Sequence, residues 1–245
     1  MSMWRKFSMF AGRWPRVRRS AHPRQKISRR KSRGGANWFA AEKSGRYSPR
    51  VNKPGWKTIS SEQQFADPHL EVVNVRVQTP TQSKPRSWTI VHRKAAVIIA
   101  PMTRDGKILL IKQERVPIRE AIWEMPAGQI DNHETEENEI KQVALRELRE
   151  ETGYQLAANG ELVSLGRYFS SPGFTDEFGY LFLARPVERC ADGDEQDETE
   201  SILDCREFSI PEIRRMIAEN EIRDANTLGI CARLAARGLI SLDSR

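Results

Sequence analysis

The sequence predicts an α/β layered fold, in which strands and helices are mixed around a central β-hairpin. Two apolar runs, residues 94–101 and 108–111, flank Asp105-Gly106, and an Asp-Gly pair between such runs is a strong hairpin signal. Apolar residues then recur at helical spacing between Asn138 and Thr152. Strands and helices that follow one another in this way pack as layers around one core.

Composition divides the chain into three segments: a basic tail (residues 1–53), a small antiparallel β subdomain (residues 54–91) and a main domain (residues 92–245). A chain of 245 residues can bury one sizeable core with a small addition, but it is short for two full domains. We therefore expect one catalytic domain with additions.

The tail is rich in Arg, Ser, Gly and Pro without a sustained apolar period, so we expect it to be disordered. Residues 1–41 hold twelve Lys and Arg and no acid. Without those twelve, the chain has 28 basic and 33 acidic residues, a net charge of −5 although the whole chain carries +7. A dispensable extension, an organelle-targeting segment and a contact site for nucleic acid or anionic lipid all fit this composition.

The cysteines favour a reducing compartment. Cys190, Cys205 and Cys231 form no C-x-x-C pair and have no cluster of histidines nearby, which disfavours both a zinc site and a disulfide framework. No apolar run approaches the roughly 18 residues that span a bilayer. We expect a soluble cytoplasmic protein without membrane contact, with organelle import by residues 1–41 as the alternative.

Residues 56–91 are expected to form the strands of the small antiparallel sheet. Short stretches rich in Val, Thr and Trp are separated by Pro80 and Pro85, and residues 70–77 partly alternate between apolar and polar side chains. These features are typical of short strands.

Three helices are expected in the main domain. The first lies between Asn138 and Thr152, and Gly153 follows where a C-cap glycine is favoured. The second follows Pro211, and the third begins near residues 226–227 and ends at Gly238.

The first helix carries the candidate site. Glu147, Glu150 and Glu151 are spaced i, i+3 and i+4, so their carboxylates share the face opposite the apolar stripe. One interpretation is a solvated acidic face, since Arg146 and Arg149 are interleaved with the acids. The other is a site for Mg²⁺ or Mn²⁺, because these ions prefer oxygen ligands and retain waters that a phosphate can replace.

The motif around this helix resembles the Nudix box. Gly128-x5-Glu134 is followed by Arg146-Glu-Leu-Arg-Glu-Glu-Thr-Gly-Tyr154, and residues 146–154 match the box at every specified position. The family has seven residues between its spaced glutamate and the arginine, whereas this chain has eleven, residues 135–145. Four extra residues amount to about one helical turn, so they leave the metal face intact but put the role of Glu134 in doubt.

Further segments are similar to the ADP-ribose pyrophosphatase branch of that family. Residues 113–115 and 123–128 resemble its segments before the box, and residues 171–177 resemble its loop with a proline, here Pro172. Pro172 lies slightly further beyond the box than the proline does in the family. We expect the extra residues in a turn at residues 157–160. The resemblance covers roughly residues 56–239 and implies an α/β/α sandwich on a mixed sheet, preceded by a small sheet used for homodimerisation.

The resemblance also implies a metal site. Glu147 and Glu151 would ligate two or three Mg²⁺ ions, or Mn²⁺ as an alternative, with Glu150 close by and the backbone carbonyl of Ala127 as a further ligand. Arg146 would orient the box glutamates, since ligating carboxylates need partners of their own.

Substrate-binding and base residues follow in the same way. Arg115, Glu124 and Pro172 match positions that line the pocket, and the alternative for Arg115 is a surface salt bridge. The acidic run at residues 192–200 has the composition of a solvated turn. By resemblance it carries a Glu-x-Glu pair, Glu198 and Glu200, that would supply the general base, with Glu150 as the next candidate.

The expected reaction is metal-dependent hydrolysis of the pyrophosphate bond of ADP-ribose, or a related nucleoside diphosphate sugar, to AMP and ribose 5-phosphate. Alternatives are another nucleotide substrate (GDP-mannose, a dinucleoside polyphosphate or an oxidised nucleotide), a module that binds ADP-ribose without cleaving it, and an RNA-processing enzyme that uses the basic tail. No Ser/His/Asp or Cys/His arrangement indicates a covalent nucleophile.

Overall fold

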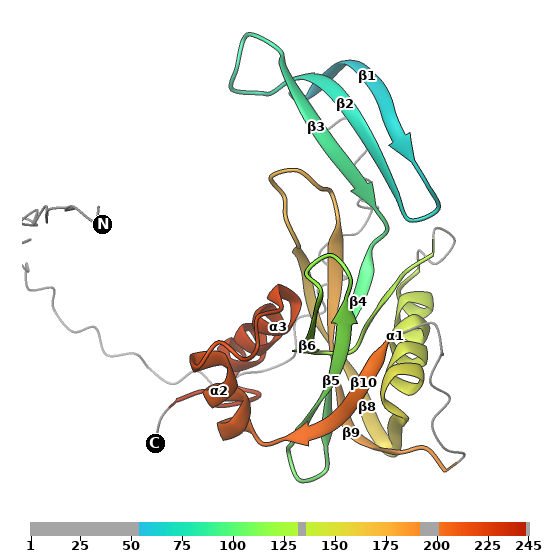
Figure 1. Ribbon diagram of the computed structural model, residues 1–245, viewed down its shortest axis with the longest axis vertical. Helices are drawn as coiled ribbons and strands as arrows, with labels where there is room; N and C mark the ends of the chain where they lie inside the picture. Colours follow the sequence, from blue (N-terminus) through green and yellow to red (C-terminus); the bar gives the residue numbers. More distant parts are fainter. Residues whose placement is uncertain (1–53, 132–135, 192–200, 244–245) are drawn as a thin grey trace, which may run out of the picture. The chain divides into compact units, whose positions relative to one another are not determined.

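The computed structural model describes residues 54–131, 136–191 and 201–243 (Figure 1). All of them belong to one of the two units into which the chain divides, Asn37–Arg245. The predicted tail, residues 1–53, lies outside the described residues.

A three-stranded sheet precedes the main domain, as predicted. It consists of β1 (Lys57–Ala66), β2 (Leu70–Gln78) and β3 (Arg86–Arg93), each antiparallel to its neighbour. Pro80 and Pro85 lie in the connection between β2 and β3, where proline does not interrupt a ladder of hydrogen bonds. Every residue of β1 is exposed, so the described residues leave both faces of this strand uncovered.

The second sheet has seven strands and is mixed. Its core order is β10-β5-β4-β9-β8, with β6 paired to β5 and β7 paired to β4. Only the central β4 and β9 are parallel, and the other pairs are antiparallel. The strands are β4 (Ala96–Thr103), β5 (Ile108–Arg115), β6 (Glu120–Glu124), β7 (Ala127–Gln129), β8 (Tyr154–Phe169), β9 (Phe178–Arg189) and β10 (Ile202–Phe208).

The predicted hairpin joins β4 to β5. Gly106 adopts φ 82°, a left-handed conformation that glycine reaches without strain. The Thr103 N–H donates to the Lys107 carbonyl at 2.8 Å, and the Thr103 hydroxyl donates to Asp105 at 2.6 Å. The Asp-Gly signal therefore identified this turn correctly.

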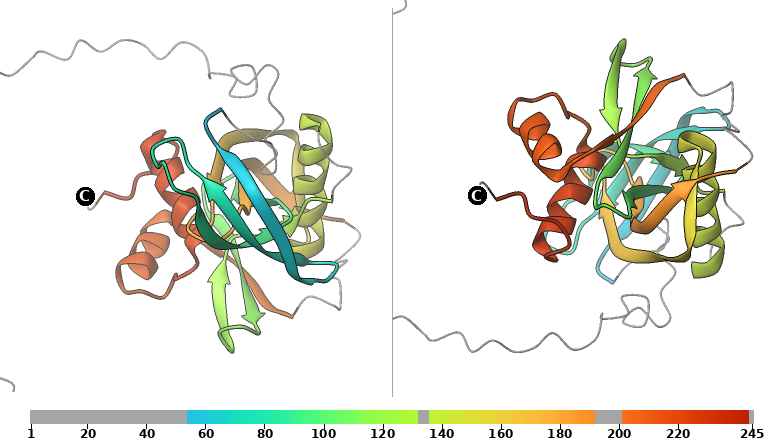
Figure 2. Two further views of the ribbon diagram at one scale, coloured as in Figure 1. Left: turned by 90° about the horizontal axis from the view of Figure 1, so that it is seen from above. Right: turned by 90° about the horizontal axis from the view of Figure 1, so that it is seen from below.

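Helices cover both faces of the second sheet (Figures 1 and 2), which gives the expected α/β/α sandwich. The helix α1 (Glu137–Thr152) lies on one face, and α2 (Ile210–Ala218) and α3 (Ala225–Ala236) lie on the other. Alternate residues of β4 explain this arrangement: Val97 and Ile99 belong to the core with α1, whereas Ile98 and Ala100 belong to the core with α2 and α3. A central strand buried on both faces accounts for the nearly continuous apolar run.

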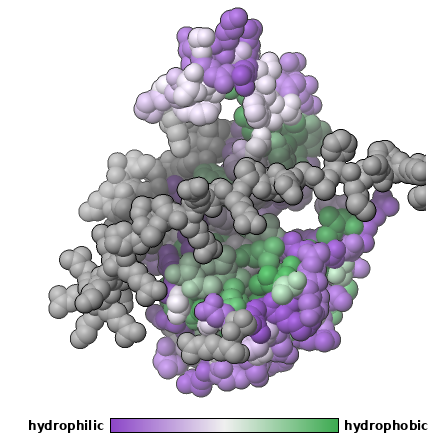
Figure 3. Space-filling view, turned by 90° about the vertical axis from the view of Figure 1, so that its left-hand side faces the viewer, coloured by the Kyte–Doolittle hydropathy of each residue, from purple (hydrophilic) through white to green (hydrophobic). Residues whose placement is uncertain are grey.

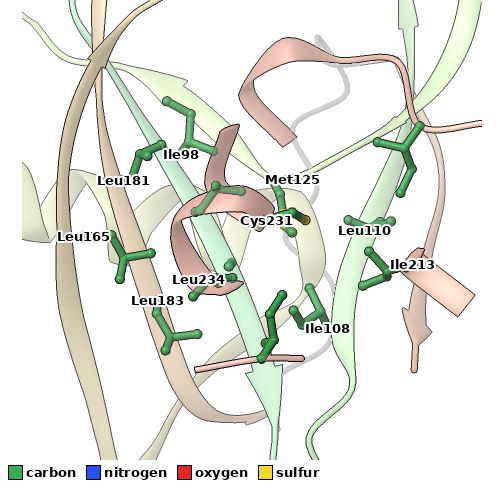
Figure 4. Packing of buried hydrophobic residues seen from close by; sticks show 14 of the residues in the cluster. Ile98, Ile108, Leu110, Met125, Leu165, Leu181, Leu183, Ile213, Cys231 and Leu234 are labelled. Carbon is green, nitrogen blue, oxygen red and sulfur yellow. The ribbon is translucent and has the colours of Figure 1, made fainter. Parts of the chain in front are cut away.

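The hydrophobic core beneath α2 and α3 contains residues from both helices and from the strands that they cover. In Figure 4, Leu110 of β5 lies beside Ile213 of α2, and Cys231 and Leu234 of α3 lie between these residues and the Ile98 and Leu181 side chains. Hydrophobic residues also gather on the face shown in Figure 3, at the level of these two helices. In the part of the chain that the structure describes, no helix is both long and apolar enough to cross a bilayer.

Helix boundaries follow their capping residues. Gly153 caps α1 with φ 68°, and its N–H donates to the Arg149 carbonyl at 2.9 Å. The helix α2 begins one residue before Pro211, because Ser209 and Glu212 form a capping box and proline is tolerated in the first turn. The ends of α1 and α3 and the start of α2 therefore lie within two residues of their predicted positions.

Residues 157–160, where we expect a turn that holds the extra residues before Pro172, lie within β8, at an irregularity of its pairing with β9. Leu156 pairs with Val187 of β9, and the next pair joins Glu161 to Arg185. The pairing of β8 with β9 therefore shifts at residues 157–160, as at a β-bulge, and it shifts again between Ser164 and Gly166.

Candidate active site

Two glutamates of α1 are buried. Glu147 is 6% exposed and Glu151 is 1% exposed, whereas about a third of the Glu150 side chain is accessible. Carboxylates are seldom buried to this degree unless a partner compensates their charge. The interpretation of this helix face as a solvated acidic surface therefore fails for Glu147 and Glu151.

Both buried glutamates contact the backbone of β7. The Ala127 N–H donates to Oε2 of Glu151 at 2.7 Å. A Cβ atom placed on Gly128 would lie 1.9 Å from Cδ of Glu147 and 2.1 Å from its Oε1, so only glycine allows this approach. The box glycine thus has a steric role, which brings the Ala127–Gly128 backbone against the acidic face of α1.

Arg146 holds two of the glutamates from the solvent side. Its Nη2 lies 2.8 Å from Oε1 of Glu147, and its Nη1 lies 2.8 Å from Oε2 of Glu150. Half of the Arg146 side chain is exposed, so its charge offsets the acids without closing the site. Arg146 is therefore in position for the orienting role that the resemblance implies, and that role stays a prediction.

The donors on this face suit a hard cation. Among the described residues, no group of three or more His, Cys, Asp and Glu side chains is gathered as a ready metal site. The arrangement instead combines two buried carboxylates, Glu147 and Glu151, with the backbone of Ala127 that Glu151 contacts. Carboxylate and carbonyl oxygens are the ligands that Mg²⁺ and Mn²⁺ prefer, so these residues fit the implied metal.

Arg115 and Glu124 form a bidentate ion pair at the ends of β5 and β6. Nε of Arg115 lies 2.9 Å from Oε1 of Glu124, and its Nη2 lies 2.6 Å from Oε2. Glu124 is 3% exposed, whereas 40% of the Arg115 side chain is accessible. The pair is therefore not a surface salt bridge, because its acidic partner is buried.

The electrostatics of this pair connect it to α1. Burial raises the pKa of Glu124, and the ion pair with Arg115 only partly offsets that effect. The hydrogen bonds to Glu124 raise the pKa of Arg115, and the negative charge of Glu151 adds to this shift. Arg115 thus lies within electrostatic reach of Glu151 of α1, and part of the Arg115 side chain is accessible.

Gln113 is a candidate that the sequence motif contained but to which we assigned no role. The residue is 7% exposed, and its Oε1 has no hydrogen-bond partner within the described residues. Gln113 precedes Arg115 by two positions in β5, so both side chains lie on one face of the sheet. An unpaired buried oxygen costs about 1–3 kcal/mol, a cost that a ligand's donor would relieve.

The loop that contains Pro172 docks on β3. The Val91 N–H donates to the Phe174 carbonyl at 2.8 Å, and Nε1 of Trp88 donates to the Gly173 carbonyl at 2.9 Å. His92 Nδ1 lies 2.5 Å from Oδ2 of Asp176. These contacts fix the loop to the three-stranded sheet.

A cavity of about 770 Å³ lies between that sheet and the loop. Pro172 is among its lining residues, together with the aromatic rings of Trp56, Trp88, Phe169 and Phe174. The lining does not include Arg115, Glu124 or the helix glutamates. The structure therefore brings Arg115 and Glu124 together but places Pro172 at a separate cavity.

Three predicted residues, Glu134, Glu198 and Glu200, lie outside the described residues. The residue that follows the acidic run is described: the carbonyl of Ser201 accepts a hydrogen bond from the Glu114 N–H at 3.0 Å. Ile202 then pairs with Gln113 as β10 begins. The first described residues after the acidic run, Ser201 and Ile202, thus lie beside the end of β5 that carries Arg115.

The sequence of this chain matches a known protein family. The family model described as the NUDIX domain matches residues 91–228. The ADP-ribose pyrophosphatase of Bacillus subtilis (strain 168) is 33% identical over 171 residues, which cover 70% of this chain and 88% of that protein. The methanol dehydrogenase activator of Bacillus methanolicus is 32% identical over 172 residues, again 70% and 88% of the two chains.

The fold also matches a solved structure, described as the crystal structure of an ADP compounds hydrolase. The match has a TM-score of 0.62 and covers 78% of this chain and all of the other chain. At 18% sequence identity, this similarity supports the fold.

Proposed function

The chain belongs to the Nudix hydrolase family, and we propose that it hydrolyses the pyrophosphate bond of ADP-ribose to AMP and ribose 5-phosphate. The observation that carries the proposal is the pair of buried glutamates, Glu147 and Glu151, against the Ala127–Gly128 backbone. The Bacillus subtilis relative that is named an ADP-ribose pyrophosphatase aligns over 171 residues, which extends beyond the NUDIX domain match at residues 91–228. This similarity supports ADP-ribose as the substrate.

Glu147 and Glu151 would hold two or three Mg²⁺ ions, with Mn²⁺ as the alternative. The Ala127 carbonyl would be a further protein ligand, and Glu150 would lie close to the ions. When bound, the ions neutralise charge on the diphosphate and acidify the attacking water. Arg146, which contacts Glu147 and Glu150, would keep their carboxylates oriented toward the ions.

Arg115 would bind the diphosphate. A guanidinium presents several N–H donors in a fixed plane, which suits phosphate oxygens, and the exposed part of Arg115 is available for that contact. The buried Glu124 would hold the guanidinium in place through the bidentate pair. Gln113 Oε1, on the same face, would accept a hydrogen bond from a substrate hydroxyl or a water.

A carboxylate outside the metal ligands would accept the proton of the attacking water. We assign this role to Glu198 or Glu200, with Glu150 as the next candidate. A glutamate that coordinates a cation is a weaker base, which argues against Glu147 and Glu151. The pairing of Ser201 and Ile202, which directly follow the acidic run in sequence, with Glu114 and Gln113 of β5 supports the assignment.

A second copy of the chain would cover the three-stranded sheet. Large apolar side chains on β1 and β3 are about half exposed, namely Ile59, Phe65 and Trp88, as is Trp56 just before β1. Contiguous exposed apolar surface is typical of an interface. We therefore propose a homodimer in which the partner also closes the cavity near Pro172.

A substrate panel tests the proposal. Purified protein with Mg²⁺ or Mn²⁺ is incubated with ADP-ribose, GDP-mannose, a dinucleoside polyphosphate and an oxidised nucleotide, and the products are identified. We expect the highest kcat/KM with ADP-ribose and equal amounts of AMP and ribose 5-phosphate. A higher kcat/KM with another substrate would overturn the substrate assignment, and tight binding of ADP-ribose without cleavage would indicate a binding module.

A further inference from the structure

The N-terminus of α3 is hydrogen-bonded to the backbone that leads to Ala127. Asp224 caps this helix: its Oδ2 accepts the N–H of Thr227 at 2.7 Å and the Thr227 hydroxyl at 2.8 Å. Because the hydroxyl proton is directed at Asp224, the oxygen of Thr227 is left to accept. It accepts the Met125 N–H at 2.8 Å.

This contact is fully enclosed. Thr227 is 0% exposed and Met125 is 1% exposed, so water cannot replace the hydroxyl without a rearrangement. A buried N–H without an acceptor is costly, and the bond therefore fixes where the Met125 backbone can lie. Thr227 and Met125 are 102 residues apart in sequence.

Residues 125–127 are each tethered to a different layer. The Met125 N–H is held by α3, the Pro126 carbonyl accepts the Ile99 N–H of β4 at 2.9 Å, and the Ala127 N–H donates to Glu151 of α1 at 2.7 Å. Pro126 lacks an N–H, so Thr227 provides the last amide tether before Ala127. A shift at Met125 would pass to Ala127 through two nearly rigid peptide planes.

We propose that Thr227, oriented by Asp224, is a positioning residue that sets the place of the Ala127 carbonyl relative to Glu147 and Glu151. The helix α3, on the face of the sheet opposite α1, would thereby tune the metal affinity of the site. The inference rests on the proposed function, because it takes Ala127, Glu147 and Glu151 as the metal ligands. Residues that orient a metal ligand typically change metal affinity by about 10–100-fold when they are replaced.

The test measures metal binding without substrate. Free Mn²⁺ is quantified by electron paramagnetic resonance during titration of the wild type, Thr227→Val and Thr227→Ser. Thr227→Val keeps the shape but removes the acceptor, and we expect it to weaken Mn²⁺ binding about tenfold or more. Thr227→Ser keeps the hydroxyl and should retain affinity to within about threefold of the wild type, since the buried Met125 N–H still has its acceptor.

A matched control separates positioning from general loss of stability. Ser209 caps α2 as Asp224 caps α3, and it forms a capping box with Glu212. Ser209→Ala should lower the melting temperature without changing Mn²⁺ affinity. The kinetic counterpart is a fall in kcat for Thr227→Val, with the KM for ADP-ribose unchanged at saturating Mg²⁺.

The outcomes distinguish the two proposals. If the wild type does not bind Mn²⁺, the proposed metal site is wrong. If the wild type binds and folded Thr227→Val binds equally well, the metal site stands and the positioning role is overturned. Should Thr227→Val not fold, Asp224→Ala carries the test, because it leaves the Thr227 hydroxyl unoriented, and wild-type affinity in that variant would overturn the inference.

Discussion

Gly128 and Glu147 lie so close that a Cβ atom on Gly128 would be 1.9 Å from the Glu147 carboxyl carbon. No side chain can occupy that space, and Glu147 cannot withdraw freely because Arg146 holds its Oε1 at 2.8 Å. Glycine is therefore required at this position because any side chain would collide with the Glu147 carboxylate. The backbone does not require it, since Gly128 has no positive φ.

Gly128→Ala should consequently reduce turnover by at least about a hundredfold, in line with the cost of misplacing a reacting group by 1 Å. The measurement is kcat on ADP-ribose with saturating Mg²⁺, together with circular dichroism to monitor folding. Gly229→Ala is the matched control, because a Cβ there meets nothing within 4 Å. It lies inside α3 and should stabilise the fold by about 0.5–1 kcal/mol. Wild-type turnover in Gly128→Ala would show that the position of Glu147 is not critical.

The metal site predicts a second result. Glu147→Gln and Glu151→Gln should each lower kcat by orders of magnitude, because each removes a ligand charge while the amide preserves the shape of the side chain. Mg²⁺ should raise the melting temperature of the wild type, since an ion that binds only the folded state stabilises it, and this increase should be smaller in both variants. Glu137→Gln, at the partly exposed start of α1, should retain normal kcat. If both buried variants keep near-normal turnover, the assignment of these ligands is incorrect.

The buried pair of Arg115 and Glu124 predicts a pH dependence of stability. Burial raises the pKa of Glu124 above its ordinary 4.5, so the folded state binds this proton more tightly than the unfolded state does. The tighter binding of this proton by Glu124 increases the free energy of unfolding. This increase is fully present below pH 4.5 and is lost as the pH rises through the raised pKa. Urea denaturation across the acidic range, up to neutral pH, should show the wild type losing stability relative to Glu124→Gln as the pH increases. A constant difference between the two proteins would contradict the raised pKa.

The basic tail gives a fourth prediction. Deletion of residues 1–52 should leave kcat and KM on ADP-ribose essentially unchanged, because that segment lacks the periodic apolar residues with which to pack. Deletion through Trp88 should abolish activity, since it removes β1, β2 and the residue that bonds the Pro172 loop through Gly173. Steady-state kinetics and the oligomeric state of both truncated proteins check this. A large loss of turnover in the shorter deletion would mean that the tail contributes to the site or the dimer.

Short sequence motifs predicted the helices and strands of this fold, but they did not predict contacts between residues far apart in sequence. Asp105-Gly106 and Gly153 impose backbone conformations through their own chemistry, so the hairpin and the end of α1 could be predicted. The bond from Met125 to Thr227 spans 102 residues, and no pattern of either segment indicates it. The unpaired oxygen of Gln113 likewise depends on what surrounds β5, which only the assembled sheet determines.

The general base provides the last prediction. Glu198→Gln and Glu200→Gln should lower kcat strongly, and at least one of them should do so with little change in KM or in Mg²⁺ affinity. A base that accepts a proton in the transition state contributes typically about 10²–10⁴-fold, so a loss of that size is expected. Glu188→Gln, an exposed position of β9, is the control for loss of an acid elsewhere on the surface. The measurement is kcat against pH with single-turnover kinetics, because removal of the base should also abolish the acidic limb of the profile. If both variants retain wild-type kcat across pH, the base lies elsewhere. Glu150 is then the next candidate, since its side chain is about a third accessible and Arg146 already holds it beside Glu147.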